Sequence, residues 1–157
     1  SRRASAARNA AACREFHTVI VVYTNVVSEL MRPNPNAAVV TWVHSHSPRE
    51  LYTTAVTLAE IRYGIERLDA GRRKEEFTAA AEEIFEAFGE FVLPFDRKAA
   101  INYAAIVNAR NRAGLPIDGF DAQIAAICST HAATLATRNV KDFLGTGIEI
   151  TDPWRPS

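Results

Sequence analysis

The feature that most constrains the fold is a short run of β-branched apolar residues, 18–23, that passes directly into a helical segment. A run so short and so uniformly apolar predicts a strand buried on both faces, as in a parallel sheet. Thr24 and Asn25 follow at once, and we expect them to cap a helix that ends before Pro33. The chain therefore turns from strand to helix at Tyr23, where a crossover connection between parallel strands can begin.

The same alternation of strand and helix continues along the rest of the chain. Parallel strands need crossover connections, which are almost always right-handed, so the alternation predicts an α/β fold: a three-layer α/β/α sandwich with a parallel sheet. In such folds the working site lies outside the carboxyl ends of the strands. Further strands are predicted at residues 51–53, 91–93, 134–137 and 147–150, and further helices at residues 36–44, 54–68, 72–88, 97–113 and 117–129.

Length and composition fit one globular domain. The chain has 157 residues, of which 48% are apolar and 23% charged, enough for one compact core. Basic and acidic residues balance at 18 each, so any contact with nucleic acid must rely on a local basic rim. No apolar run reaches the ~18 to 20 residues that cross a bilayer, so membrane insertion is not expected. Cys13 and Cys128 lie far apart, which favours a reduced, cytoplasmic setting.

The first sixteen residues differ from the rest of the chain. They are rich in Ala and Arg, contain Glu15 as their only acid, and lack a starting Met. We interpret residues 1–16 as a leader separate from a domain at residues 17–155. A transit peptide, a remnant of an expression vector, an extended reading frame and a flexible basic arm would all have this composition.

Acidic residues stand near the starts of several predicted elements. Glu60 lies on a helix that follows a strand, Asp118 and Asp121 open another helix, and Asp142 follows the strand at residues 134–137. Carboxylates gathered at one edge of a sheet bind hard cations such as Mg²⁺. The chain has no glycine-rich phosphate loop, no Gly-x-Ser-x-Gly elbow and no His-Glu-x-x-His helix, which argues against nucleotide cofactors and serine chemistry.

Four segments in a fixed order, with Pro153-Trp154 after them, resemble a PIN domain of the VapC/FitB branch. They are VYTNVVSEL at 22–30, LAEIRYGI at 58–65, DAQIAA at 121–126 and LATRNVKDF at 135–143. The resemblance implies a Mg²⁺- or Mn²⁺-dependent endoribonuclease, usually the toxin component of a type II toxin–antitoxin system. It also implies RNA as substrate, a homodimer, and a possible hetero-oligomer with a cognate VapB/FitA-type antitoxin that docks near the helical arm.

The resemblance further implies which residues hold the metal ion. It assigns Glu60 and Asp121 to the metal site and a fourth polar position to the loop after residues 134–137, where Asn139 and Asp142 both remain open. We therefore expect Glu60, Asp121 and Asp142 as metal ligands, with Asn139 as a further catalytic candidate. Acids packed together repel one another, so at least one of them should have a raised pKa until metal arrives.

Position 23 departs from the family pattern. The family has Asp there, in Asp-Thr-Asn, and this chain has Tyr23. A phenol with an unperturbed pKa of ~10 is neutral at pH 7, so it gives a metal ion no charge and brings a bulky ring into a small pocket. We expect impaired cleavage, and the alternative is a catalytically silent PIN fold that binds antitoxin or RNA without cleaving.

Several nearby residues are expected to support the site without binding the metal. Thr24, Asn25 and Asp118 are expected to orient the ligands. Arg138 is a candidate for contact with a phosphate of the RNA, although a lone Arg is more often simply solvated.

The site assignments have purely structural alternatives. Glu60 could complete a capping box with Thr57, and Asp118 and Asp121 could be acids favoured by the helix macrodipole. The histidines at 44 and 46 could ligate a metal but are more typical of a polar loop. A receiver-like domain is disfavoured, because we find no plausible phosphoacceptor Asp that ends a central strand and pairs with a downstream Lys-Pro.

Overall fold

The computed structural model describes residues 18–156, and the leader expected at residues 1–16 lies outside them. Within the described residues, every strand pairs in parallel in a single sheet with the order β3-β2-β1-β4-β5. The strands are β1 (Ile20–Val22), β2 (Leu51–Thr54), β3 (Val92–Leu93), β4 (Thr134–Ala136) and β5 (Glu149–Thr151). The edge strand β5 lies slightly later than the predicted 147–150, and the parallel sheet itself is as predicted.

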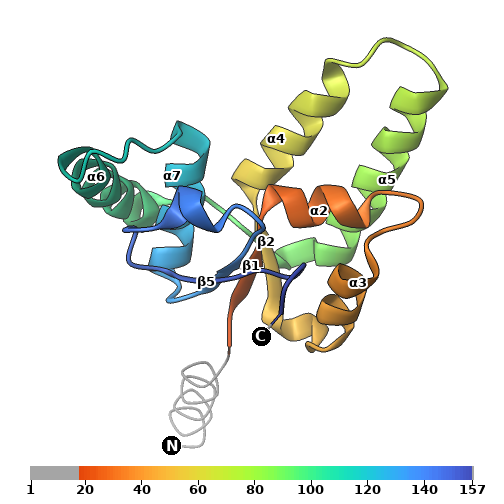
Figure 1. Ribbon diagram of the computed structural model, residues 1–157. Coiled ribbons are helices and arrows are strands. Elements are labelled where there is room, and N and C mark those ends of the chain that lie inside the picture. The colour runs from red at the N-terminus through yellow and green to blue at the C-terminus, as the bar shows by residue number, and fades with distance from the viewer. Residues whose placement is uncertain (1–17, 157) are drawn as a thin grey trace, which may run out of the picture.

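Helices cover both faces of this sheet, as the three-layer prediction requires (Figure 1). Helices α6 and α7 pack on one face, and α2 to α5 lie on the other, where α4 and α5 form a hairpin that projects beyond the sheet. No helix among residues 18–156 is both long and apolar enough to cross a membrane. The helices are α2 (Thr24–Leu30), α3 (Ala37–His44), α4 (Ala55–Glu66), α5 (Arg72–Phe88), α6 (Arg97–Arg112) and α7 (Gly119–Thr130).

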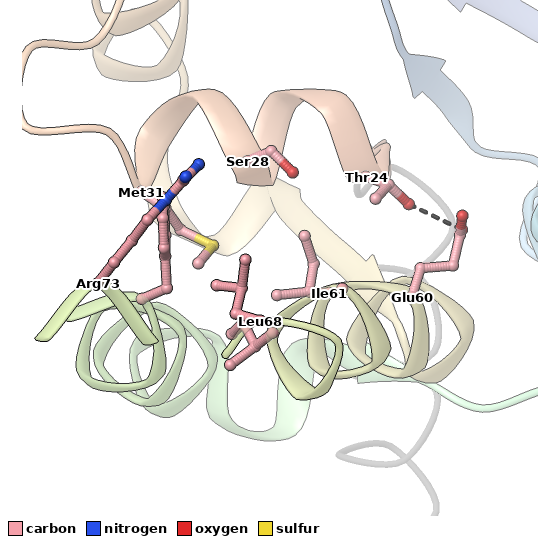
Figure 2. A pocket seen from close by; sticks show the side chains of 10 residues that line it. Thr24, Ser28, Met31, Glu60, Ile61, Leu68 and Arg73 are labelled. Carbon is pink, nitrogen blue, oxygen red and sulfur yellow. Dashed lines mark hydrogen bonds between the residues drawn. The ribbon is translucent and has the colours of Figure 1, made fainter. Parts of the chain in front are cut away.

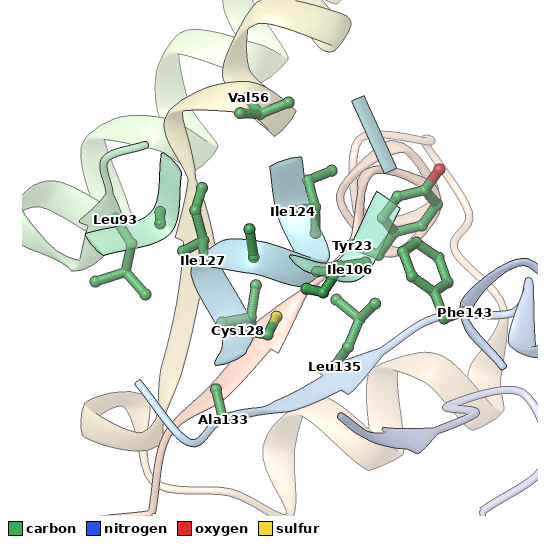
Figure 3. Packing of buried hydrophobic residues seen from close by; sticks show 14 residues of the cluster. Tyr23, Val56, Leu93, Ile106, Ile124, Ile127, Cys128, Ala133, Leu135 and Phe143 are labelled. Atoms are coloured by element: carbon green, nitrogen blue, oxygen red, sulfur yellow. The ribbon is translucent and has the colours of Figure 1, made fainter. Parts of the chain in front are cut away.

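Strand β1 is buried on both faces, which explains its apolar sequence. Successive side chains of a strand point to opposite faces. Ile20 and Val22 accordingly pack in the core beneath α2 to α5, whereas Val21 packs in the core beneath α6 and α7. Tyr23 continues this alternation and points into the same core as Val21 (Figure 3).

Polar side chains begin several helices where capping was predicted. Asn36 accepts hydrogen bonds from the backbone N–H groups of the first turn of α3, and Asp96 does the same for α6. Thr54 caps α4 by accepting from the backbone of Thr57. Thr57 therefore lies inside the helix, and the alternative in which it forms a capping box with Glu60 is wrong.

The expectation that Thr24 and Asn25 cap α2 is also wrong. The cap position is Tyr23, and no side chain accepts a hydrogen bond from the first turn. Thr24 and Asn25 are the first residues of the helix, and their side chains bond to residues of other elements instead. Neither side chain is used as a cap, and both lie at the carboxyl edge of the sheet, where the acids were expected.

Candidate active site

The predicted site residues converge at the carboxyl ends of β1, β2 and β4. Tyr23 directly follows β1, and Glu60 lies on α4, which begins directly after β2. Asp121 lies in the first turn of α7, and Asp142 in the 3₁₀ turn Val140–Phe143 that follows β4. The negative charge of Asp121 contributes to raising the pKa of Glu60, after burial as the larger cause. The carboxylate of Glu60 thus lies within range of the charge of Asp121.

Tyr23 lies between the acids and the core. Its phenol donates a hydrogen bond to Oδ1 of Asp121 at 2.6 Å, and its ring packs edge-to-face against Phe143 with centroids 5.3 Å apart (Figure 3). The side chain is only 7% exposed. Burial, the bond to Asp121 and the charges of Glu60 and Asp142 all raise the pKa of Tyr23 above its ordinary value. Tyr23 is consequently a neutral donor at any physiological pH.

Glu60 is held from α2. Thr24 donates a hydrogen bond from Oγ1 to Oε1 of Glu60 at 2.9 Å (Figure 2). Burial raises the pKa of Glu60, the bond from Thr24 opposes that rise, and the negative charges of Asp121 and Asp118 add to it. Thr24 therefore orients this carboxylate, in line with the role expected for it.

Asp121 carries opposing influences of its own. Burial raises its pKa, the hydrogen bond from Tyr23 opposes the rise, and the charges of Asp118 and Asp142 add to it. The expectation of a raised pKa among the acids is thus confirmed for Glu60 and Asp121, but burial is a larger cause than repulsion. Asp118 caps α7, accepting from the backbone N–H groups of Phe120 and Asp121 at 2.9 and 3.4 Å. It orients the turn that carries Asp121.

Asn139 and Asp142, both open at the fourth position, differ in their surroundings. The negative charge of Asp142, whose side chain is exposed, contributes to raising the pKa of both Tyr23 and Asp121. Asn139 instead lines a neighbouring hollow, and its backbone N–H donates to Oγ1 of Thr137 at 3.0 Å. Asn25 likewise bonds to Thr137, from Nδ2 at 3.4 Å, and makes no hydrogen bond to the acids. Of the two, Asp142 is the residue whose charge reaches the acids, and the fourth position stays a prediction for both.

The acids do not form a closed ligand cage. Among residues 18–156, no group of three or more His, Cys, Asp or Glu side chains lies close enough together to hold a metal ion. The two histidines do not supply one either, because His46 pairs with Glu50 at 3.4 Å and packs against the ring of Trp42. What the site offers is a loose set of carboxylates, one of which already accepts a hydrogen bond from Tyr23.

The fold and these residues have clear counterparts among known proteins. The profile of the PIN-domain family matches residues 20–145. The chain belongs to the PIN-domain family.

Two curated PIN-domain relatives and one solved structure cover nearly all of this sequence. The VapC ribonuclease Y4jK of Sinorhizobium fredii is 36% identical over 140 residues, spanning 88% of this chain and 100% of the relative. The toxin FitB of Neisseria gonorrhoeae is 36% identical, spanning 87% and 99%. The crystal structure of FitAcB from Neisseria gonorrhoeae superposes with a TM-score of 0.81 at 36% identity, over 87% of this chain and 99% of that one.

Sequence reasoning missed one residue close to the acids of this PIN domain. Arg110, in the last turn of α6, is 5% exposed and donates hydrogen bonds to the carbonyls of Leu115 and Leu144. Its charge lowers the pKa of Asp121. In sequence, Arg110 is indistinguishable from the basic residues that commonly end helices, so no local pattern could have revealed its burial.

Glu60 should make the metal-free protein less stable as pH rises. An acid whose pKa is higher in the folded state favours folding below its unfolded value, about 4.3, and this contribution is lost as pH rises through the folded value. Glu60→Gln should therefore gain stability relative to the parent between about pH 4 and pH 7, by less than about 1 kcal/mol because solvent partly screens the side chain. Urea unfolding in EDTA measures this difference. Glu66→Gln, exposed on the same helix, is the control, and an equal pH dependence in both variants would contradict the assignment.

Proposed function

We propose that this PIN domain is a metal-dependent endoribonuclease, the toxin component of a type II toxin–antitoxin system, whose activity is impaired by Tyr23. The observation that carries the proposal is the pairing of the Tyr23 phenol with Asp121 inside an otherwise acidic cluster. The acids support a site for RNA cleavage, as do the relatives called ribonuclease and toxin. The phenol supports the impairment.

The carboxylates are of the kind that a divalent ion prefers, but among residues 18–156 no three ligating side chains lie close enough together to enclose one. Glu60, Asp121 and Asp142 would hold Mg²⁺ or Mn²⁺, and Mg²⁺ is commonly bound through one or two carboxylates, substrate phosphate and several waters. When bound, the ion supplies a water of lowered pKa and offsets charge on the attacked phosphate. The raised pKa values of Glu60 and Asp121 fit such a role, because a cation would relieve the burial of their charges.

The protein's own groups would position these ligands. Thr24 would hold Glu60, and Asp118 would hold the first turn of α7 and with it Asp121. Tyr23, where the family pattern has an acid, would lower metal affinity, because it adds no charge and donates a hydrogen bond to an oxygen that the metal needs. Asn139 remains a further catalytic candidate from its place in the loop after β4.

An antitoxin segment would bind along the helical arm. A groove of about 330 Å³ runs between α2, α4 and α5, from Thr24 and Glu60 to Arg73 and Phe77 (Figure 2). It begins at a ligand of the proposed metal site, so an occupant could reach that site directly. The antitoxin would be of the VapB/FitA type. The chain would form a homodimer, and a hetero-oligomer with the antitoxin, in the cytoplasm. These parts of the proposal rest on the likeness to the VapC and FitB proteins.

A second candidate function is a catalytically silent module that binds antitoxin or RNA. The same bond favours it, because Tyr23 occupies an oxygen of Asp121 and no three ligating side chains gather among residues 18–156. The two functions differ in one measurable property, which is whether any RNA is cleaved when metal is supplied.

The test is cleavage of a labelled RNA pool with Mg²⁺, with Mn²⁺ and with EDTA. We expect slow, metal-dependent cleavage that Glu60→Gln reduces by at least about tenfold, since removing one preorganised electrostatic group commonly costs more. Glu66→Gln, exposed further along the same helix, should leave the rate unchanged. If neither the parent nor Tyr23→Asp cleaves with either metal, the endoribonuclease is excluded and the silent module is favoured.

A further inference from the structure

A second hollow, of about 460 Å³, adjoins the proposed active site on the other side of α2. Tyr23 and Thr24 belong to its wall, so it opens beside the residues that contact Asp121 and Glu60. The rest of the wall comes from α2, from Arg32 just after that helix, from the loop after β4 and from Trp154 near the end of the described chain. The hollow is therefore assembled from distant segments at the same edge of the sheet as the acids.

Arg138 supplies the only uncompensated charge among the residues that line this hollow. The other charged side chains there are Arg32 and Glu29, which pair with each other at 3.2 Å. Arg138 is exposed and makes neither an ion pair nor a side-chain hydrogen bond among residues 18–156. Its guanidinium lies over the ring of Trp154, with the carbon 5.2 Å from the ring centroid. The hollow thus has a positive wall next to a negative cluster.

Trp154 holds this guanidinium in a defined place. The indole packs against the core cluster under α2 to α5, and the backbone N–H of Trp154 donates to Oδ1 of Asp152 at 2.9 Å. A guanidinium that lies over an aromatic ring can still donate from its N–H groups. Those N–H groups match the oxygens of a phosphate. Arg138 therefore has N–H groups available for an anion, and the contact with Trp154 favours one position of its guanidinium.

We propose that this hollow binds a phosphate of single-stranded RNA next to the phosphate that the acids face, with Arg138 as the anion contact and Trp154 as its platform. The inference deepens the proposed function and rests on it for the identity of the ligand. A cluster of carboxylates repels the RNA backbone, and a chain of zero net charge has no overall field to offset that repulsion. A local cation beside the cluster supplies the missing attraction.

Binding of a labelled single-stranded RNA oligonucleotide, followed by fluorescence anisotropy in EDTA, tests the site without cleavage. Arg138→Gln should raise the Kd about tenfold at low salt and reduce the slope of log K against log salt by about 0.7, the value for one phosphate contact on a single strand. Arg67→Gln is the matched control: Arg67 also lies over an aromatic ring, 5.6 Å from the Tyr63 centroid, but outside the hollow. This control should leave the Kd within about twofold.

Equal affinity and equal salt slope for Arg138→Gln and Arg67→Gln would overturn the proposal. Unlabelled duplex DNA of the same length is added as a competitor. If it competes as strongly as unlabelled single-stranded RNA, the assignment to single-stranded RNA is overturned. The assay also separates this inference from the proposed function. If RNA binding depends on Arg138 but the protein never cleaves, the phosphate site is supported and the nuclease is refuted. If the protein cleaves RNA but binding does not depend on Arg138, the nuclease is supported and the phosphate site is refuted.

Discussion

Tyr23→Asp is expected to raise metal-dependent RNA cleavage by on the order of 10²-fold, the effect of restoring one preorganised electrostatic group. The substitution removes the phenol that donates to Asp121 at 2.6 Å and adds a carboxylate at the end of β1. Both changes favour a divalent ion, because an oxygen of Asp121 is released and the negative charge of the site increases. Initial rates with Mn²⁺ and Mg²⁺, beside calorimetric titration with Mn²⁺, measure the gain.

Two further variants at this position identify the cause. Tyr23→Asn has nearly the size of Asp without its charge, and it should recover little activity. Tyr23→Phe removes the hydrogen bond to Asp121 while keeping the ring against Phe143, and it should also remain slow, because no ligand is added. Urea unfolding of each variant shows whether loss of the buried ring has altered the fold. Rates for Tyr23→Asp no higher than those of the parent would refute an impairment by Tyr23.

Arg110→Met is expected to lower the free energy of unfolding by about 3 kcal/mol, the order of magnitude for two hydrogen bonds from a charged, buried donor to backbone carbonyls. Arg110 joins two loops: Leu115 precedes the helix that carries Asp121, and Leu144 follows the turn that carries Asp142. Without the guanidinium both carbonyls lose their partner, and the acids lose a fixed separation. Denaturant unfolding measures the stability, and Mn²⁺ titration of folded protein measures the effect on the site.

Arg112→Met provides the control for this prediction. Arg112 lies on the same helix two residues later and is exposed, so its replacement should change the free energy of unfolding by no more than about 0.5 kcal/mol. A similar loss in both variants would mean that α6 requires positive charge at its end rather than the two specific bonds of Arg110.

The strands, helices and caps could largely be predicted because they depend on short-range patterns. The apolar run before Tyr23 specifies a buried strand, and the caps at Asn36 and Asp96 satisfy backbone groups a few residues away. The cap of α2 was wrong for a related reason. Thr24 is a favourable cap by type, but its hydroxyl donates to Glu60 on another helix, and local propensity cannot represent that competition.

By itself the sequence determined the α/β order of elements, the presence of acids at the carboxyl edge of the sheet and the likeness to PIN domains. Tertiary structure alone decided the surroundings of those acids. Tyr23 bonds to Asp121, 98 residues away, and the buried Arg110 lowers the pKa of Asp121 by its charge. The physical reason is range. Periodicity and capping act over a few residues, whereas hydrogen bonds and charges act between side chains that only the packing of strands and helices brings together.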